Sequence, residues 1–229
     1  EVLRDGAAAQ YGSDAIAGLN NLIVKANVGL EANASYGQTS RNDGQTTNLN
    51  LNYGTKIGKN GGFINLTGEF NNREKTNRSQ NHNLVIFDQS AYDNYFAYDY
   101  SNDNARAIDD AAIAAAGLTR DDFNFQIGDA KIRNVQGFFN MSVPVNSNIE
   151  FYASGGMSHR NGTGFGFRRL PSETGNVVAA LFPYGFPPEL NSIVNDKSLN
   201  SGFKFKLADW NLDLSNTFGQ NIFDYGVSN

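Results

Sequence analysis

The 229-residue chain has few side chains of the types that carry out acid–base, nucleophilic or metal chemistry. His82 and His159 are the only histidines, and cysteine is absent. The two histidines lie too far apart in the sequence to form a metal-binding motif. There is no Ser-His-Asp arrangement, no His-Glu-x-x-His motif and no phosphate-binding Gly-x-x-x-x-Gly-Lys motif. We therefore expect no enzyme, no catalytic residue, no bound metal and no cofactor.

Two polar stretches contain residues suited to ligand binding. Residues 87–104 (FDQSAYDNYFAYDYSNDN) are rich in tyrosine, which offers both apolar area and a hydrogen-bonding hydroxyl. The alternative is that these rings only pack the loop against itself. An arginine pair in residues 160–197 would attract an anionic ligand, unless it is ordinary solvated loop charge. The candidate ligand-binding residues are Tyr92, Tyr95, Phe96, Tyr98, Arg168 and Arg169.

Composition narrows the class of protein. The net charge of -5 disfavours a nucleic-acid partner, because phosphate contacts need clustered Lys and Arg. Mean hydropathy is -0.45, and no stretch approaches the roughly 18 apolar residues of a transmembrane helix. A helical membrane protein is therefore disfavoured. A membrane β-barrel is not, because its strands alternate between apolar and polar residues.

Hydrophobicity alternates with a period of two along most of the chain after residue 26, which predicts about seven β-strands with one apolar and one polar face. If these strands belong to a membrane barrel, the apolar face meets lipid and the polar face lines the lumen. The residues predicted to face lipid include Val28, Leu51, Leu66, Phe139, Phe151, Phe205 and Leu214. The residues predicted to face the lumen include Glu31, Asn50, Glu69, Glu150, Lys204 and Asp213.

Connections of two very different lengths separate these strands. Short turns are predicted at residues 58–62, 146–148 and 208–209. Long polar segments are predicted at residues 71–130 and 160–197. Short turns that alternate with long loops are typical of outer-membrane barrels, although residues 39–44 form a short connection on the long-loop side.

One helix is expected inside the first long loop. In NARAIDDAAIAAAGLTRDDF, residues 104–123, Ala, Ile108 and Ile113 recur at helical spacing and Gly117 can end the helix. The carboxylate pairs at 109–110 and 121–122 are expected on its solvated face.

A soluble antiparallel sandwich or a solenoid would also show alternation. Two features favour the membrane barrel. The apolar faces carry almost no charge, and the polar faces are rich in Asn, Ser and Thr as well as in charged residues. A soluble sandwich usually also has shorter loops.

The first 25 residues, EVLRDGAAAQYGSDAIAGLNNLIVK, crowd small residues between two short apolar segments. This stretch resembles the end of the plug domain of TonB-dependent outer-membrane receptors, where E-V-[LI]-R-[GD] precedes Y-G-S-x-A-I-x-G. Residues 208–229, ADWNLDLSNTFGQNIFDYGVSN, resemble a barrel segment of the same family. Asn20 departs from the pattern, because the family usually has an apolar residue there.

The resemblance implies an all-β fold. Residues 1–26 would be the C-terminal end of an α+β plug domain, and residues 27–229 the N-terminal part of a transmembrane antiparallel β-barrel with one short helix in a long extracellular loop. Barrels of this family have about 22 strands around a plugged lumen. We therefore expect the chain to be a fragment of a longer one.

The resemblance also implies a function. The receptor would lie in the outer membrane of a Gram-negative bacterium, in contact with its lipid, and would import a siderophore, cobalamin or an oligosaccharide with energy delivered by TonB. Arg4 occupies the position of a plug arginine, so we expect it to pair with carboxylates of the lumen. The candidate plug–barrel contacts are Arg4, Glu31, Glu69, Glu150 and Asp213. The alternatives are a soluble or surface-anchored β-rich binding module, such as an adhesin or lectin, and an outer-membrane barrel enzyme.

Overall fold

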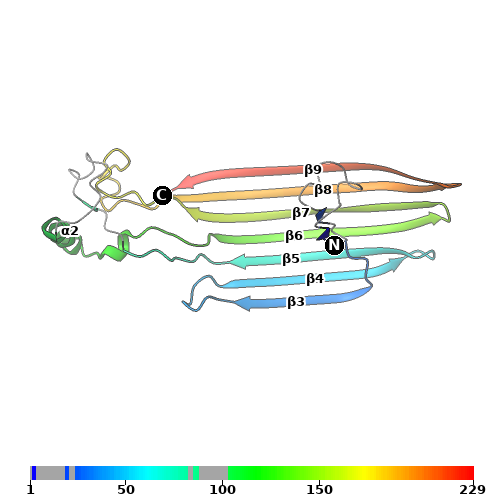
Figure 1. The fold of residues 1–229 in the computed structure, drawn as a ribbon, viewed down its shortest axis with the longest axis horizontal. Helices are drawn as coiled ribbons and strands as arrows, with labels where there is room; N and C mark the ends of the chain where they lie inside the picture. Colours follow the sequence, from blue (N-terminus) through cyan, green and yellow to red (C-terminus); the bar gives the residue numbers. More distant parts are fainter. Residues whose placement is uncertain (1, 4–18, 21–23, 82–84, 88–102) are drawn as a thin grey trace.

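The computed structural model describes residues 2–3, 19–20, 24–81, 85–87 and 103–229. Its main element is a seven-stranded antiparallel sheet in which the strands follow one another in chain order (Figure 1). The strands are β3 (Gly29–Gly37), β4 (Thr46–Ile57), β5 (Gly62–Arg73), β6 (Lys131–Asn146), β7 (Ile149–Phe165), β8 (Glu189–Leu207) and β9 (Trp210–Ser228). The expected all-β architecture is confirmed. This sheet is open, with β3 and β9 at its edges.

A second, much smaller sheet pairs β1 (Val2–Leu3) with β2 (Leu19–Asn20) in antiparallel orientation. It lies within the stretch that resembles a plug domain. Only these four residues are described before residue 24.

The strand register places the alternating residues on two continuous faces. Tyr53 on β4 pairs with Leu66 on β5, and Leu66 pairs with Phe139 on β6. The same row ends at Leu199 and Phe218 on the last two strands. Side chains alternate between the two faces along every strand. Knowing the face of this one cross-strand row therefore gives the face of every residue in the sheet. The predicted grouping is therefore confirmed for the residues of the strands: their apolar set lies on one side, called here the apolar face, and the carboxylates, Asn50 and Lys204 lie on the other, the polar face. Val28 precedes β3 and belongs to neither face of the sheet.

The connections are segregated to the two ends of the sheet. All three predicted short turns are present at one end, called here the turn end, and the long connections lie at the opposite, loop end (Figure 1). Residues 58–61 show how tight these turns are, since Gly58 and Gly61 have φ values of 68° and 84°, in the left-handed region that suits glycine.

The second long connection is shorter than the sequence predicts. Strands β7 and β8 remain paired beyond residues 160 and 197, so only residues 166–188 connect them. The prediction is wrong because polar residues occupy both faces near the loop end. Alternation then disappears from the sequence while the backbone hydrogen bonds continue.

Two helical segments lie at the loop end, α2 (Asp103–Ala115) and the short 3-10 helix η2 (Arg120–Phe123). The predicted helix is confirmed. Gly117 has a φ of 71° and its N–H reaches the carbonyl of Ala114, so it ends α2 as expected. Within the described ranges, no helix has both the length and the apolar character needed to cross a membrane.

The buried apolar core lies among the loops rather than against the sheet. Its residues are Ile86, Ile113, Phe123 and Leu170, with Phe87 and Leu118 packed beside them. This loop-end core joins segments of both long connections, because Ser172 donates from its N–H to the carbonyl of Ile86 and from its hydroxyl to that of Val85.

Asp109 overturns one expectation. It is 3% exposed and accepts hydrogen bonds from the backbone N–H groups of Ile86 and Phe87. Arg120 completes its shell at 3.1 Å. This carboxylate is not on a solvated helix face; it links α2 to the preceding loop. Its neighbour Asp110 is about half exposed and also bonds Arg120.

Candidate functional site

Amide side chains form hydrogen-bonded pairs across the polar face. Asn50 and Gln136 both donate to Glu69, which joins three adjacent strands. Asn52 is the most buried member, at 1% exposure, and bonds Asn65 at 2.6 Å and Thr67 at 2.7 Å. These pairs satisfy polar groups that have little access to water. On β4 and β5 the polar face is therefore a hydrogen-bonded network of amide side chains.

The chain segment before β3, residues 24–28, lies across this polar face. The side chain of Asn140 donates to the carbonyl of Lys25 at 3.1 Å. Asn65 donates to the side-chain oxygen of Asn27 at 3.1 Å and to its carbonyl at 3.4 Å. Gly54 permits the approach, because a Cβ there would lie 1.8 Å from the carbonyl oxygen of Asn27. The end of the plug-like stretch is thus attached to the polar face.

The apolar face remains uncovered among the described residues. Leu30, Met157 and Leu214 are each about two-thirds exposed, and large apolar residues of every strand accompany them. Contiguous exposed apolar area on this scale marks a surface that meets a partner or a membrane.

The apolar face carries an uncharged belt, called here the apolar band. Its loop-side boundary is the first long polar or charged residue of this face on each of β5 to β8. These boundary residues are Asn72, Arg133, His159 and Lys197. Between them and the short turns, no residue of this face on β5 to β8 is charged.

From β6 to β8 the loop-side boundary lies two residues nearer the turn end on each successive strand. Asn72 pairs with Arg133, but the partner of Arg133 on β7 is Asn161, two residues nearer the loops than His159. The partner of His159 on β8 is Asn195, again two residues nearer the loops than Lys197. From β5 to β8 the boundary therefore moves four residues toward the turn end.

The border of the band at the turn end shifts by the same four residues. Phe63 is the second residue of β5, and its cross-strand partners on β6, β7 and β8 are Ser142, Tyr152 and Gly202. Gly202 is the sixth residue of β8 counted from the turn end, four places further into its strand than Phe63. The band therefore keeps its height while it crosses the strands obliquely.

The two arginines of the predicted ligand site occupy different environments. The Arg168 guanidinium lies over the ring of Phe123, 5.3 Å from its centre, and donates to the carbonyl of Tyr184. Burial lowers the pKa of Arg168 because the charged form loses hydration. Arg169 forms an ion pair with Glu173, with 3.9 Å between the guanidinium and the carboxylate. Arg168 thus rests on the loop-end core, and Arg169 lies outside it.

The other predicted ligand-binding residues, Tyr92, Tyr95, Phe96 and Tyr98, lie outside the described residues. So does Arg4, and its pairing with lumen carboxylates stays a prediction.

Each of the four carboxylates proposed to meet Arg4 already has a partner in the chain. Glu31 pairs with Lys25, and Glu69 accepts from Asn50 and Gln136. The two nearer the turn end are likewise engaged: Glu150 lies 3.9 Å from Lys204, and Asp213 accepts from Tyr152 at 2.7 Å.

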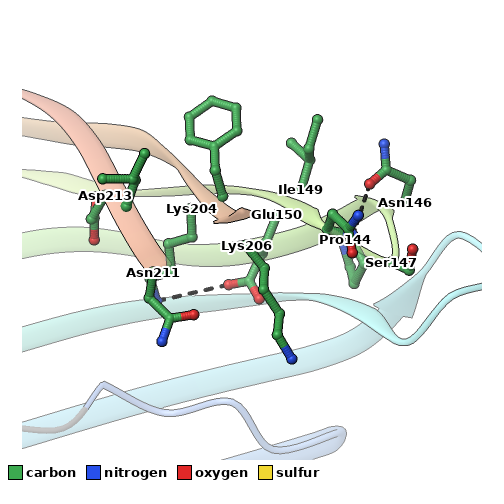
Figure 2. Close-up of a pocket in the computed structure, with 12 residues that line it drawn as sticks. Pro144, Asn146, Ser147, Ile149, Glu150, Lys204, Lys206, Asn211 and Asp213 are labelled. Atoms are coloured by element: carbon green, nitrogen blue, oxygen red, sulfur yellow. Dashed lines mark hydrogen bonds and ion pairs between the residues drawn. The ribbon is translucent and has the colours of Figure 1, made fainter. Parts of the chain in front are cut away.

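A recess of about 490 Å³ lies at the turn end of β6 to β9. Figure 2 shows Ile149 and Lys206 extending to opposite sides of the sheet there. Its lining combines Glu150, Lys204 and Asp213 with turn residues such as Asn146 and Ser147. No group of three or more metal-ligating side chains occurs in the part of the chain that the structure describes. The recess offers charged groups of both signs but no catalytic arrangement.

An ion pair closes the short connection at the loop end. Asp43 binds both terminal nitrogens of Arg78, at 2.6 and 2.9 Å, and also accepts from Thr39. The Arg78 guanidinium holds the pKa of the Asp43 carboxyl well below its usual range. This pair ties the β3–β4 connection to the segment that follows β5.

Sequence reasoning missed two features of the site. One is the attachment of residues 24–28 through Asn27 and Asn65, which lie far apart in the chain. The other is the row of basic residues Arg133, His159 and Lys197 along the band boundary. A search for charged residues at apolar-face positions could have found this row, but only the register shows that its members are neighbours.

Comparison with protein-family models, with curated proteins and with solved structures found no match to this chain. Function must therefore be inferred from the sequence and the geometry described above.

Proposed function

We propose that the seven-stranded sheet is part of the wall of an outer-membrane β-barrel, and that the chain belongs to a TonB-dependent receptor that imports a scarce nutrient. The apolar face would meet lipid and the polar face would line the lumen. The nutrient would be a siderophore, cobalamin or an oligosaccharide, bound by the loop end. TonB would act through the plug that precedes residue 27.

The oblique course of the apolar band is the observation that carries this proposal. A shift of four residues over the three steps from β5 to β8 is about 1.3 residues per strand. With about 3.3 Å per residue and about 4.8 Å between strands, that shift corresponds to a strand tilt of roughly 40°. Transmembrane barrels tilt their strands by about 35–45° relative to a flat lipid layer.

The height of the band also fits a lipid bilayer. From Ile149 to Met157 on β7, and from Leu199 to Leu207 on β8, the band covers nine residues. A tilted strand needs about 9–11 residues to cross the hydrocarbon layer. Packing of a second protein sheet requires an apolar face but not a border of constant height, so the band supports lipid as the neighbour.

The polar face supports the receptor part of the proposal. Residues 24–28 cross it and are hydrogen-bonded to Asn65 and Asn140. This is where the resemblance to a plug domain ends and where the plug would enter the barrel wall. A chain that entered from outside would have to cross the apolar face instead.

Fluorescence quenching tests the orientation directly. These 229 residues contain no cysteine, so each single-cysteine variant adds one labelling site to them, and any cysteine elsewhere in the full-length protein is first replaced with serine. Leu214→Cys and Ser215→Cys are a matched pair, adjacent in sequence and on opposite faces. In outer-membrane vesicles, a label at 214 should be quenched by doxyl lipid and protected from iodide. A label at 215 should not be quenched by doxyl lipid, whatever the depth of the doxyl group in the membrane. Protection of position 214 from both quenchers would indicate a protein partner, as in the alternative binding module, and would refute the proposal.

Import needs a separate measurement. Uptake of radiolabelled cyanocobalamin, a panel of ferric siderophores and labelled oligosaccharides is compared between cells with and without the receptor. The proposal expects one of these substrates to lose receptor-dependent uptake when TonB is deleted. Receptor-dependent uptake that persists without TonB would contradict it.

A further inference from the structure

Three basic residues form one row at the loop-side border of the apolar band. Arg133, His159 and Lys197 lie on β6, β7 and β8 and all belong to the apolar face. Each is the first long polar residue beyond the band on its strand. Successive members are diagonal neighbours across adjacent strands, a separation of about 7–8 Å. The row therefore follows the oblique border rather than one line of the register.

The two longer cations of the row have no acidic partner. Among the described residues, neither Arg133 nor Lys197 forms an ion pair; Arg133 lies over the ring of Phe70, 5.6 Å from its centre. His159 lies between them, with its ring held by Asn195 at 2.7 Å. The strand carboxylates of this face are Asp224 on β9 and Glu189 on β8, and both lie on the loop side of the row. The row thus concentrates positive charge beside uncharged surface.

An apolar recess of about 570 Å³ opens on the turn side of the row. Two glycines of the apolar face, Gly137 and Gly155, leave its floor without side chains. The apolar-face residues of its lining are Leu66, Gly137, Phe139, Gly155, Met157, Lys197, Leu199 and Phe218. Lys197 therefore belongs to both the recess and the row, while a second, smaller recess contains Arg133 and His159.

We propose that this surface binds one lipid with a phosphorylated headgroup, a proposal that rests on the barrel function proposed above. The Lys197 ammonium, which borders the recess, binds the phosphate oxygens at the border of the band, and Arg133 and His159 add positive charge along the same border. An acyl chain lies in the recess over Gly137 and Gly155. Charge complementarity and the match between an apolar recess and a cationic row select this occupant over a protein segment.

Binding is tested with the full-length protein in a neutral detergent after removal of its lipids. Dioleoyl phosphatidic acid and dioleoyl phosphatidylcholine are titrated separately, and bound lipid is counted by native mass spectrometry. Wild type should retain phosphatidic acid at a much lower concentration. The double variant Arg133→Gln, Lys197→Gln should bind it about thirtyfold more weakly. Arg160→Gln with Lys206→Gln is the matched control, because it removes the same charge from the polar face of β7 and β8.

Filling the recess tests the acyl chain separately from the headgroup. A Cβ at Gly137 would meet its nearest heavy atom at 3.9 Å, an ordinary contact, so Gly137→Leu fits the backbone. It should weaken phosphatidic acid binding, while Ala34→Leu, which places the same side chain on the apolar face of β3, leaves it unchanged. Arg133→Lys with Lys197→Arg should restore binding if the glutamine variant fails to fold.

Three outcomes would overturn the inference. The first is equal retention of the two lipids by wild type. The second is unchanged binding in the glutamine variant, and the third is full competition by millimolar inorganic phosphate, which would assign the row to a free anion. If position 214 is quenched by doxyl lipid while any of these results holds, only this inference fails. If position 214 is shielded from lipid, the proposed function fails first.

Discussion

Replacing Asn65 with alanine tests whether the buried amide cluster anchors residues 24–28 to the polar face. Asn65 donates to Asn27 and, at 3.2 Å, to the side-chain oxygen of Asn52. It also accepts from the nitrogen of Asn52 at 2.6 Å. Asn52 is 1% exposed, so water cannot easily replace what the substitution removes.

The magnitude follows from these contacts. The hydrogen bond to Asn27 contributes about 0.5–1.5 kcal/mol, and the oxygen of Asn52, left buried without a donor, costs about 1–3 kcal/mol. Asn65→Ala should therefore lower the free energy of unfolding by about 2–4 kcal/mol. Asn200→Ala is the control, because Asn200 lies in the same cross-sheet row and makes one exposed bond to Thr217. Its cost should be about 0.5 kcal/mol or less.

The assay is reversible urea unfolding of the full-length protein in lipid vesicles, read by circular dichroism. Hydrogen exchange then locates the effect, which should be concentrated in residues 24–28 and in β4 and β5. Additive effects in the double variant Asn27→Ala, Asn65→Ala would show that the two residues act independently. Equal costs at Asn65 and Asn200 would refute the reasoning.

Three further predictions use other contacts. Gly54→Ala should displace residues 24–28 and speed their hydrogen exchange, because its Cβ would occupy the position of the Asn27 carbonyl; unchanged exchange contradicts this. Asp109→Asn should destabilise the loop-end core by about 3 kcal/mol while the more exposed Asp110→Asn changes little, measured by hydrogen exchange of α2. Asp43 has a lowered pKa, so its contribution is present above the ordinary aspartate pKa and is lost as the pH falls through the lower folded value. Carboxyl NMR should show Asp43 ionised at pH 3, and Arg78→Gln should raise its pKa toward the usual range, with the hydrogen bonds from Thr39 and Asn77 still lowering it.

The sequence alone predicted the sheet well where its two faces differ chemically. Alternation from Leu199 to Leu207 places apolar residues on one side and lysines on the other, and that contrast survives in any register that keeps the faces apart. The short turns were equally readable, because glycine and asparagine mark positions with unusual backbone angles. Helix α2 was found for the same reason, through its spacing and its terminal glycine.

The sequence could not predict where strands continue without alternation. Beyond Arg160 on β7, both faces are polar, and only backbone pairing extends the strand to Phe165. Nor could it show that Asp109 is buried, since that depends on the contact between α2 and a loop more than twenty residues away. Local pattern reports the periodicity of one segment, not what packs against it.

Tertiary structure alone decided which distant residues are neighbours. Asn27 meets Asn65, and Arg133, His159 and Lys197 form a row, only because strand register aligns segments separated by tens of residues. The same register converts seven separate alternating stretches into one band with an oblique border. The sequence by itself determined the two faces of each strand. The hydrogen-bonded ladder, which sets how far each strand slides against the next, determined the tilt of the band and the composition of both candidate surfaces.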